Sequence, residues 1–236
     1  MLHQGASAVS RGRLAEAATP PPTTSWKPIP HIHLLQTVEK ALIEHGLTVQ
    51  GQAHGLTHDG ARYFGLLEVN TSSSETSRVV GIRNAHDMRF AAGIVAGSSV
   101  LVCDNLCFAG EIAFARKHTT GILRDLAGLA GSAVGRLNCY WENNEQRIHR
   151  YRSVRIGDVR AHDLIVRAVD NGVMANSYIP RVLGEWREPS HPEFRARTVW
   201  SLQNAYTEVF KGRLDLLPGR TARLHELLDQ EVGLAV

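Results

Sequence analysis

The sequence predicts an α+β protein in which an antiparallel, hairpin-rich N-terminal half packs against a helical C-terminal half. Short alternating apolar and polar runs, separated by turn residues, occupy the chain from Leu47 to His118, and this pattern is typical of antiparallel strands. Beyond His118, apolar residues recur at helical spacing between capping residues and glycines. Strands that precede helices, rather than alternating with them, indicate the α+β class.

The length allows one sizeable core. The chain has 236 residues, of which 43% are hydrophobic, enough for a single domain of this size. We assign residues 28–236 to one α+β domain. Residues 1–27 are rich in Ala, Ser, Thr, Gly and Pro, a composition that predicts a disordered or extended arm.

The first half should begin with a helix and continue as strands. Asp59-Gly60 lies between two alternating runs, which is a strong signal for a hairpin turn. The segment from Phe90 to Asn105 contains several Gly and Ser residues, so we expect two pieces around a turn. The expected elements are a helix at His31–Gly46, strands at Leu47–His54, Ala61–Val69 and RVVGIRN, a short buried strand at SVLVC, and a strand with one wet face at GEIAFARKH.

The second half should be helical. Asp158 and Thr198 each precede a run with helical periodicity, and both residue types are good N-caps. Pro218-Gly219 should open the last helix, because proline is favoured in the first turn. The expected helices are Thr119–Val134, Asp158–Asp170, a segment from Thr198 to Gly212, and TARLHELLDQE.

Composition indicates a cellular compartment but does not identify a binding partner. The formal charge is only +3, from 26 Lys+Arg against 23 Asp+Glu, so the total charge does not indicate a nucleic-acid binder by itself. Three cysteines without framework spacing favour a reducing setting. With no continuous apolar stretch of about 18 residues, the sequence predicts a cytoplasmic protein that contacts no membrane.

Two polar clusters flank the apolar run that follows residue 90. Asn84, His86 and Asp87 precede it, and Cys103, Asp104 and Asn105 follow it. If these stretches lie on neighbouring strands, their polar ends should converge. One interpretation is an acid/base or ligand site with His86 and Asp87 as candidate catalytic residues. The other is structural, with His86 and Asp87 holding a turn and Asn105 capping the strand end.

Metal ligation has little support in the sequence. Cys103 and Cys107 lack a second cysteine pair, so their spacing is not a zinc signature. His31 and His33 are two residues apart, which separates them on a helix face. We therefore predict no cofactor, and a divalent metal ion stays an open alternative.

A polar quartet marks the helix after Thr198. Trp200, Asn204, Thr207 and Glu208 share one helical face by spacing, while the opposite face is apolar. In a functional interpretation Glu208 acts as a base or ligand and Asn204 positions a substrate. In a structural interpretation the same side chains satisfy buried backbone groups.

Arginines and aromatic residues alternate in the segment around residue 145. Phosphate contact with base stacking would use residues of this kind, because guanidinium groups neutralise phosphates and aromatic rings stack on bases. The alternative is a solvated helix face paired with Glu142, Glu145, Asp158 and Asp163. The candidate nucleic-acid-binding residues are Arg136, Arg147, Arg150, Arg152, Arg155, Tyr140, Trp141 and Tyr151.

Three blocks together resemble a known family. They are GIRNAHDMRFAAGIVAGSSVLVCDNLCFAGE, RAHDLIVRAVDNGVMANSYIPRVLGEW and RTVWSLQNAYTEVFKG. In this order they resemble the prokaryotic phage/plasmid-like protein family, a domain of unknown function numbered 932. The resemblance spans roughly 47–212 and implies a mobile-element setting, in which DNA replication and recombination are common. It places the family's characteristic polar residues on Asn84, His86, Asp87, Cys103, Asn105, Trp200, Asn204, Thr207 and Glu208.

Three functional hypotheses follow. The first is a nucleic-acid-binding protein, favouring single-stranded DNA and acting in strand holding or annealing as a homo-oligomer. The second is a hydrolase or nuclease-like enzyme that uses His86, Asp87 and Glu208, although no nucleophile elbow, phosphate-binding loop or H-E-x-x-H motif is present. The third is an assembly module without chemistry.

Overall fold

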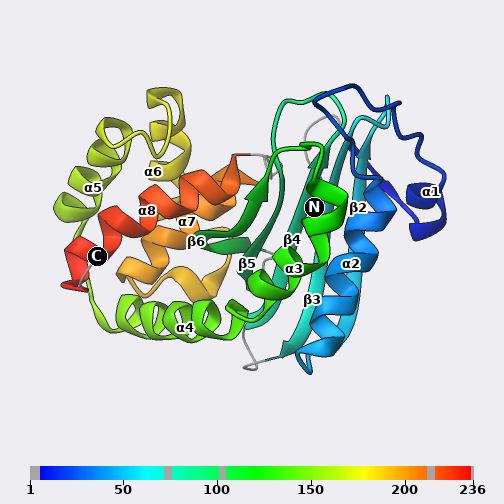
Figure 1. The fold of residues 1–236 in the computed structure, drawn as a ribbon. Coiled ribbons are helices and arrows are strands. Elements are labelled where there is room, and N and C mark those ends of the chain that lie inside the picture. Colours follow the sequence, from blue (N-terminus) through cyan, green and yellow to red (C-terminus); the bar gives the residue numbers. More distant parts are fainter. Residues whose placement is uncertain (1–5, 72–75, 101–104, 212–215, 235–236) are drawn as a thin grey trace.

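A single antiparallel sheet organises the first half of the molecule (Figure 1). The computed structural model describes residues 6–71, 76–100, 105–211 and 216–234. The sheet has six strands in the order β1-β2-β3-β4-β5-β6, and each strand pairs with its sequence neighbour. The strands are β1 Ala6–Val9, β2 Val49–Thr57, β3 Arg62–Thr71, β4 Thr76–Ala85, β5 Ala92–Val100 and β6 Asn105–Arg116.

Helices make up most of the second half. The α+β class and the order of strands before helices are thus confirmed. The helices are α1 Arg11–Ala15, α2 His31–Glu44, α3 Ile122–Val134, α4 Leu137–Ser153, α5 Asp158–Asp170, α6 Ile179–Arg187, α7 Val199–Phe210 and α8 Leu217–Val232, with 3-10 turns at Asn176–Tyr178 and Pro192–Phe194.

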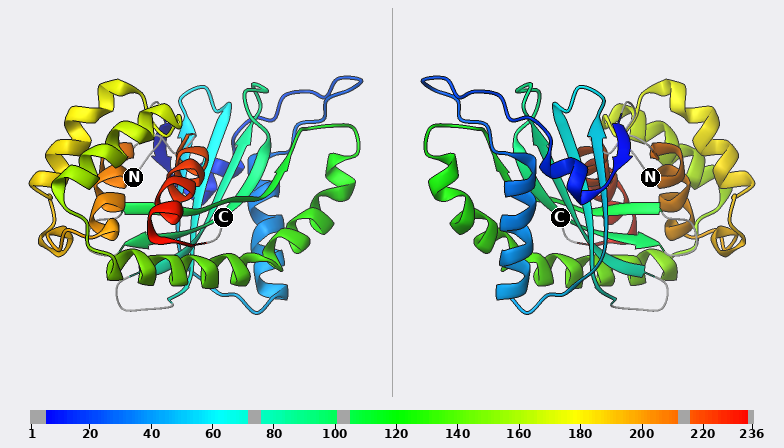
Figure 2. Two further views of the ribbon diagram at one scale, coloured as in Figure 1. Left: turned by 90° about the vertical axis from the view of Figure 1, so that its left-hand side faces the viewer. Right: turned by 90° about the vertical axis from the view of Figure 1, so that its right-hand side faces the viewer.

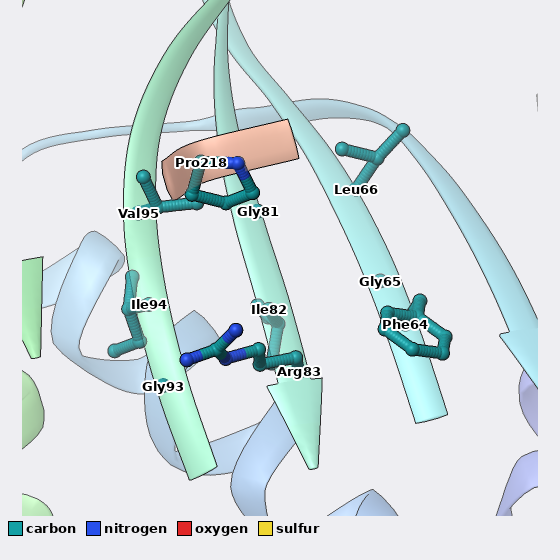
Figure 3. A pocket seen from close by; sticks show the side chains of 10 residues that line it. All are labelled: Phe64, Gly65, Leu66, Gly81, Ile82, Arg83, Gly93, Ile94, Val95 and Pro218. Carbon is teal, nitrogen blue, oxygen red and sulfur yellow. The ribbon is translucent and has the colours of Figure 1, made fainter. Parts of the chain in front are cut away.

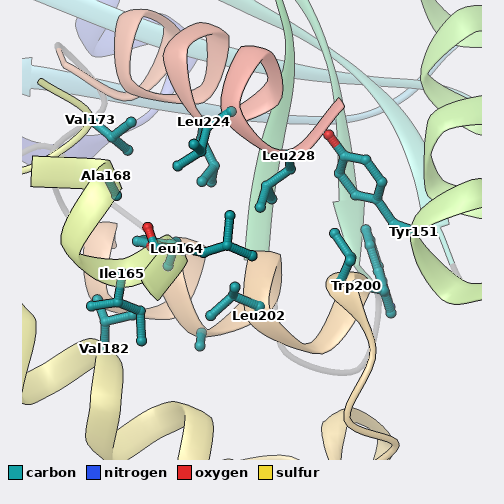
Figure 4. Close-up of a cluster of buried hydrophobic side chains, with 14 of the residues drawn as sticks. Tyr151, Leu164, Ile165, Ala168, Val173, Val182, Trp200, Leu202, Leu224 and Leu228 are labelled. Atoms are coloured by element: carbon teal, nitrogen blue, oxygen red, sulfur yellow. The ribbon is translucent and has the colours of Figure 1, made fainter. Parts of the chain in front are cut away.

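Helices lie on both faces of the sheet (Figure 2), and each face carries its own hydrophobic core. Alternation along β3 sends Tyr63 and Leu67 toward α2 and α3, and Leu66 toward the opposite face. On that opposite face Val79 and Val95 join the side chains of α4 to α8. Figure 4 shows this second core, with residues such as Leu202 and Leu228 facing one another across α7 and α8. The sheet is therefore the middle layer of the fold.

Turn and cap chemistry explains most element ends. Gly60 has φ +68° in the β2–β3 hairpin, and Gly46 has φ +73° just after α2, as these turns require of a glycine. Thr198 accepts a hydrogen bond from Ser201 N at 3.2 Å and completes a capping box at the start of α7. Asp158 is the first residue of α5 and Gly157 is the N-cap, so the predicted N-cap is off by one residue. The Asp158 carboxylate instead accepts a hydrogen bond from Trp186 Nε1 at 2.9 Å.

The expected break inside Phe90–Asn105 is wrong for the part the structure describes. Residues 92–100 form one strand, and Gly93 and Gly97 pair with Arg83 and Val79 of β4 without interruption. The irregularity lies on the other side, where the β5–β6 register shifts around Val95. The glycines thus accommodate bulges rather than a turn. Within SVLVC, residues 101–103 lie outside the described residues.

The front of the chain is more ordered than its composition predicts. Residues 6–9 add β1 to the edge of the sheet, and α1 follows directly. Arg11 pairs with Glu39 of α2, and Leu14 is buried in the first core. A low-hydrophobicity segment is therefore held by an edge-strand ladder, one buried leucine and an ion pair, which composition alone does not reveal.

Candidate functional site

The stretch GIRNAHDMRF closes β4 and turns toward β5. Asn84 points into the core under α2 and is fully buried, and His86 follows at 7% exposure. The next three residues, Asp87 to Arg89, are exposed, and Met88 adopts a left-handed φ of 62°. The stretch thus separates into a buried polar part and an exposed basic part, and each part meets a different set of residues.

Asn84 is the hub of the buried part. Its Nδ2 donates to the Ile29 carbonyl at 2.7 Å and to His31 Nδ1 at 2.9 Å. Its Oδ1 accepts from His118 Nε2 at 2.8 Å. His86 Nε2 also donates to the Ile29 carbonyl, at 2.8 Å. One amide therefore joins the sheet to the segment before α2 and to the segment after β6.

The three histidines of this cluster pack closely. The rings of His31 and His86 are stacked at 3.9 Å between centroids, and His118 meets His86 edge-on at 6.5 Å. His31 donates from Nε2 to the Gly60 carbonyl at 2.9 Å, while His118 Nδ1 accepts from Ile29 N at 3.4 Å. Because Nδ1 of both rings accepts a hydrogen bond, these two imidazoles are neutral in this arrangement.

Burial keeps the cluster uncharged. It lowers the pKa of His31 to about 3, helped by the charge that His86 would carry and opposed by the Gly60 carbonyl. It lowers the pKa of His118 to about 4, again with a contribution from His86. Burial also lowers the pKa of His86, against the opposing carbonyls of Ile29 and Ala18. The lowered pKa values favour neutral imidazoles, so the cluster acts as a neutral clamp. Among the described residues no group of three His, Cys, Asp or Glu is arranged to hold a metal ion.

This clamp predicts acid lability. A lowered folded-state pKa means that the unfolded chain binds more protons, so stability is full above the ordinary histidine pKa of about 6.5 and declines as pH falls toward about 4. His31 and His118 together should lower the free energy of unfolding by up to about 3 kcal/mol between pH 7.5 and 5.5, and His86 should add to this loss in the same direction.

Urea unfolding at both pH values checks this prediction. His118→Gln should reduce the pH dependence by about one third, while His33→Gln, at an exposed position of α2, should leave it unchanged. An equal pH dependence in the wild-type chain and the His118→Gln variant would contradict the clamp.

The exposed part of GIRNAHDMRF opens onto a hollow of about 670 Å³. The β4–β5 connection forms one wall, and residues from before α2 and after β6 form the other. Among the ten lining residues there is no carboxylate. They are Ser25, Trp26, Ala85, Met88, Arg89, Phe90, Ala91, Lys117, His118 and Thr119, and this set is called the hollow below.

The cations of the hollow face solvent. The Arg89 side chain is 72% exposed, and its nearest carboxylate, Asp87, is 3.9 Å away and already bonded to Arg62 Nε at 2.6 Å. Such an exposed, long ion pair contributes little. Lys117 is exposed as well, and so are the neighbouring Lys27 and Arg116. The rim is therefore a positive surface available to an anion.

Aromatic rings supply the walls. Trp26 is half-buried and stacks on His118, with ring centroids 6.0 Å apart and planes 16° from parallel. On the other side Phe90 packs against Phe64 at 5.5 Å, and the Arg83 guanidinium lies 5.4 Å from the Phe90 ring centroid. Rings fixed by neighbours lose little entropy when a planar ligand stacks on them.

A smaller cavity lies next to this region on the sheet face opposite α2. It measures about 30 Å³ and lies between Pro218 of α8 and the strands, with Phe64, Gly81 and Arg83 among its lining residues (Figure 3). That space is suited to about one water molecule. The hollow, in contrast, is large enough for a ligand of nucleotide size, because its volume is within the range of about 300–1,000 Å³ typical of ligand sites.

The two polar clusters expected to meet lie at opposite ends of the sheet. Arg83 pairs with Gly93 at the start of β5, whereas Asn105 pairs with Val100 at its end. One cluster precedes β5 and the other follows it, so nine residues of strand separate them by about 30 Å. The expected convergence is therefore wrong. Cys103 and Asp104 lie outside the described residues.

The predicted basic segment divides between core and surface. Trp141 and Tyr151 are buried, at 1% and 0% exposure, and donate to the Gly97 carbonyl and to Asp229. A stacking role for these two rings is not possible in this conformation. Arg147 binds Asp229 through Nε at 2.9 Å and Nη2 at 3.0 Å. Helical periodicity thus turns Arg147 and Tyr151 toward α8, and Trp141 toward β5.

The remaining members of that segment are on the surface. Arg150 donates to the Val232 carbonyl at 3.0 Å, and the Arg152 guanidinium lies 5.1 Å from the Trp200 ring centroid. Arg136 and Arg155 are exposed, and Tyr140 is half-buried. None of these residues lines the hollow.

Almost all of α7 is buried, including the predicted polar quartet except Glu208. Asn204 Nδ2 donates to the Trp200 carbonyl at 2.9 Å, and Thr207 Oγ1 to the Asn204 carbonyl at 3.1 Å. Glu208 accepts from Lys211 Nζ at 2.6 Å, and His191 Nε2 lies 4.0 Å from its carboxylate. These contacts within the helix and its surroundings agree with the structural interpretation.

The candidate catalytic residues are engaged separately. His86 bonds to Ile29, Asp87 to Arg62, and Glu208 to Lys211. No hydrogen bond or ion pair described in the structure joins Glu208 to either of the other two.

Sequence reasoning missed Trp26, Lys117 and His118 as site residues. Trp26 lies in a segment rich in Pro, Ser and Thr, and Lys117-His118 follow a strand. The available signal was a lone tryptophan in a polar, proline-rich stretch. Such a ring is buried only if residues from elsewhere in the chain pack against it, so its presence indicates a distant partner.

In the part of the chain that the structure describes, none of the helices has the length and apolarity needed to span a bilayer.

Comparison with protein-family models gives a match over most of the chain. A family model described as a domain of unknown function (DUF932) covers residues 22–233. The curated proteins and the solved structures yielded no match.

Proposed function

We propose that this chain, which belongs to the DUF932 family of unknown function, binds single-stranded nucleic acid in the hollow without breaking a bond. The observation that carries the proposal is the lining of the hollow, in which Arg89 and Lys117 lie beside Trp26 and Phe90 with no carboxylate among them. Guanidinium and ammonium groups neutralise phosphates, and the rings stack on bases.

An unpaired strand suits this arrangement better than a duplex. A base must leave its stack to lie on Trp26 or Phe90, and a single strand offers its bases at little energetic cost. Stacking accepts every base, so sequence preference should be weak. We propose DNA rather than RNA as the favoured ligand. We also propose that the protein holds or anneals single strands during phage or plasmid replication.

Titration of a labelled oligothymidylate, followed by fluorescence anisotropy, tests the proposal. The dissociation constant should be micromolar or tighter and should rise steeply with salt, because each neutralised phosphate releases counterions. Binding that is absent, or that ignores salt, would overturn the proposal.

Trp26→Leu should weaken binding about tenfold, because a stacked base contributes roughly 1–3 kcal/mol. The same anisotropy titration measures the change. The matched control is Trp186→Phe in the second core, where the indole is 1% exposed. That variant should lose stability but retain affinity under folding conditions. An equal loss of affinity in the two variants would contradict stacking on Trp26.

A further inference from the structure

Arg220, near the start of α8, has an unusual environment for a charged group. Its guanidinium carbon lies 5.0 Å from the Tyr178 ring centroid and 4.9 Å from that of Phe210. Its Nη1 is buried, and no acceptor among the described residues bonds to it. A charged group without a counter-charge is costly when partly buried, and Arg220 is only partly buried, so an anion on the exposed side of its guanidinium would supply the missing counter-charge.

A second arginine shares the same ring. The Arg181 guanidinium carbon lies 5.8 Å from the Tyr178 ring centroid, and Arg181 is exposed. No described carboxylate forms an ion pair with Arg181 or Arg220. Two like charges around one ring repel each other in the absence of a counterion. An anion between them would relieve that repulsion and accept from both.

Contacts along the sheet connect this pair to the hollow. Arg83 lies over the Phe90 ring of the hollow and also lines the small cavity under Pro218. Figure 3 shows Pro218 above β4 and β5, with Arg83 farther along β4. Arg220 follows Pro218 by two residues in the first turn of α8. Arg83 thus borders both the wall of the hollow and the cavity under the first turn of α8, the turn that carries Arg220.

We propose that Arg181, Arg220 and Tyr178 form a second anion site that takes a phosphodiester group of the same strand. This inference rests on the proposed function and extends it: the ligand is a polymer of several nucleotides that reaches from the hollow to α8. A mononucleotide would occupy the hollow alone.

Two oligothymidylates distinguish these cases, one of about four nucleotides, enough for the hollow, and one of about twenty. Wild-type protein should bind the longer strand more tightly. Arg181→Gln should weaken the longer strand about fivefold and lower its salt slope by about one, and should leave the shorter strand unchanged. Arg220→Gln should have the same effects on the longer and the shorter strand. The control is Arg223→Gln on the same helix, where Nε donates to the Gly172 carbonyl at 2.8 Å.

The outcomes separate the two proposals. Equal affinity of the wild-type protein for both lengths, or no loss in Arg181→Gln and Arg220→Gln, would overturn the second site and leave the hollow intact. A loss in the Arg223→Gln control equal to that in Arg181→Gln would also overturn it, because the effect would then be one of general charge. Failure of the wild-type protein to bind either strand would overturn the proposed function and this inference with it.

Discussion

Replacing Asn84 by alanine is expected to lower the free energy of unfolding by about 3 kcal/mol, measured by urea denaturation at pH 7.5. Asn84 is fully buried and bonds to Ile29, His31 and His118. Its removal leaves buried groups on these partners unsatisfied, each at a cost of about 1–3 kcal/mol, partly relieved by relaxation. The effect should exceed that of any single surface substitution in the chain.

A surface asparagine provides the control for that prediction. Asn143 is exposed on α4, and Asn143→Ala should change stability by less than about 0.5 kcal/mol. A loss below about 1 kcal/mol in Asn84→Ala would mean that the hub does not hold the segment before α2 to the sheet.

Reversing both cations of the hollow should have the largest effect on binding. The double variant Arg89→Glu and Lys117→Glu places two carboxylates where phosphates are proposed to lie, so affinity for single-stranded DNA should fall by about 100-fold or more. Both side chains are on the surface, so the thermal unfolding midpoint should change little. Anisotropy titration at fixed salt measures the loss.

The matched control carries the same change in net charge elsewhere. Arg13→Glu with Lys40→Glu alters side chains that are 69% and 78% exposed and outside the hollow. Long-range repulsion should weaken binding only a few-fold at physiological salt, where screening acts within about 8 Å. An equal loss in the two double variants would show that net charge, rather than the hollow, determines binding.

Local patterns were sufficient for most elements of the fold. The Asp59-Gly60 turn, the Thr198 cap and the helical periodicity before Gly46 each act over a few residues, and the structure contains all three. Gly93 and Gly97 misled the prediction because a bulge and a turn require the same residue. Only pairing with β4 and β6 distinguishes the two.

The site was harder to predict, because it depends on which distant segments meet. The importance of Asn84 and His86 was visible in the sequence, whereas their partner Ile29 and the stack of His31 on His86 come from separate segments. The arginine and aromatic pattern around Tyr151 was ambiguous, because a helix presents such residues to both core and solvent. Trp26 stacks on His118, which lies 92 residues later in the sequence.

Intrinsic tryptophan fluorescence tests the central claim most directly. Trp141, Trp186 and Trp200 are buried, at 1%, 1% and 6% exposure, whereas Trp26 is half-buried in the hollow. Stacking of a base on Trp26 should therefore quench the emission of the wild-type protein as oligothymidylate is added, and Trp26→Leu should abolish the quenching even at concentrations that saturate the variant. Unchanged emission of the wild-type protein at saturation, or equal quenching in Trp26→Leu, would contradict the binding of nucleic acid in the hollow.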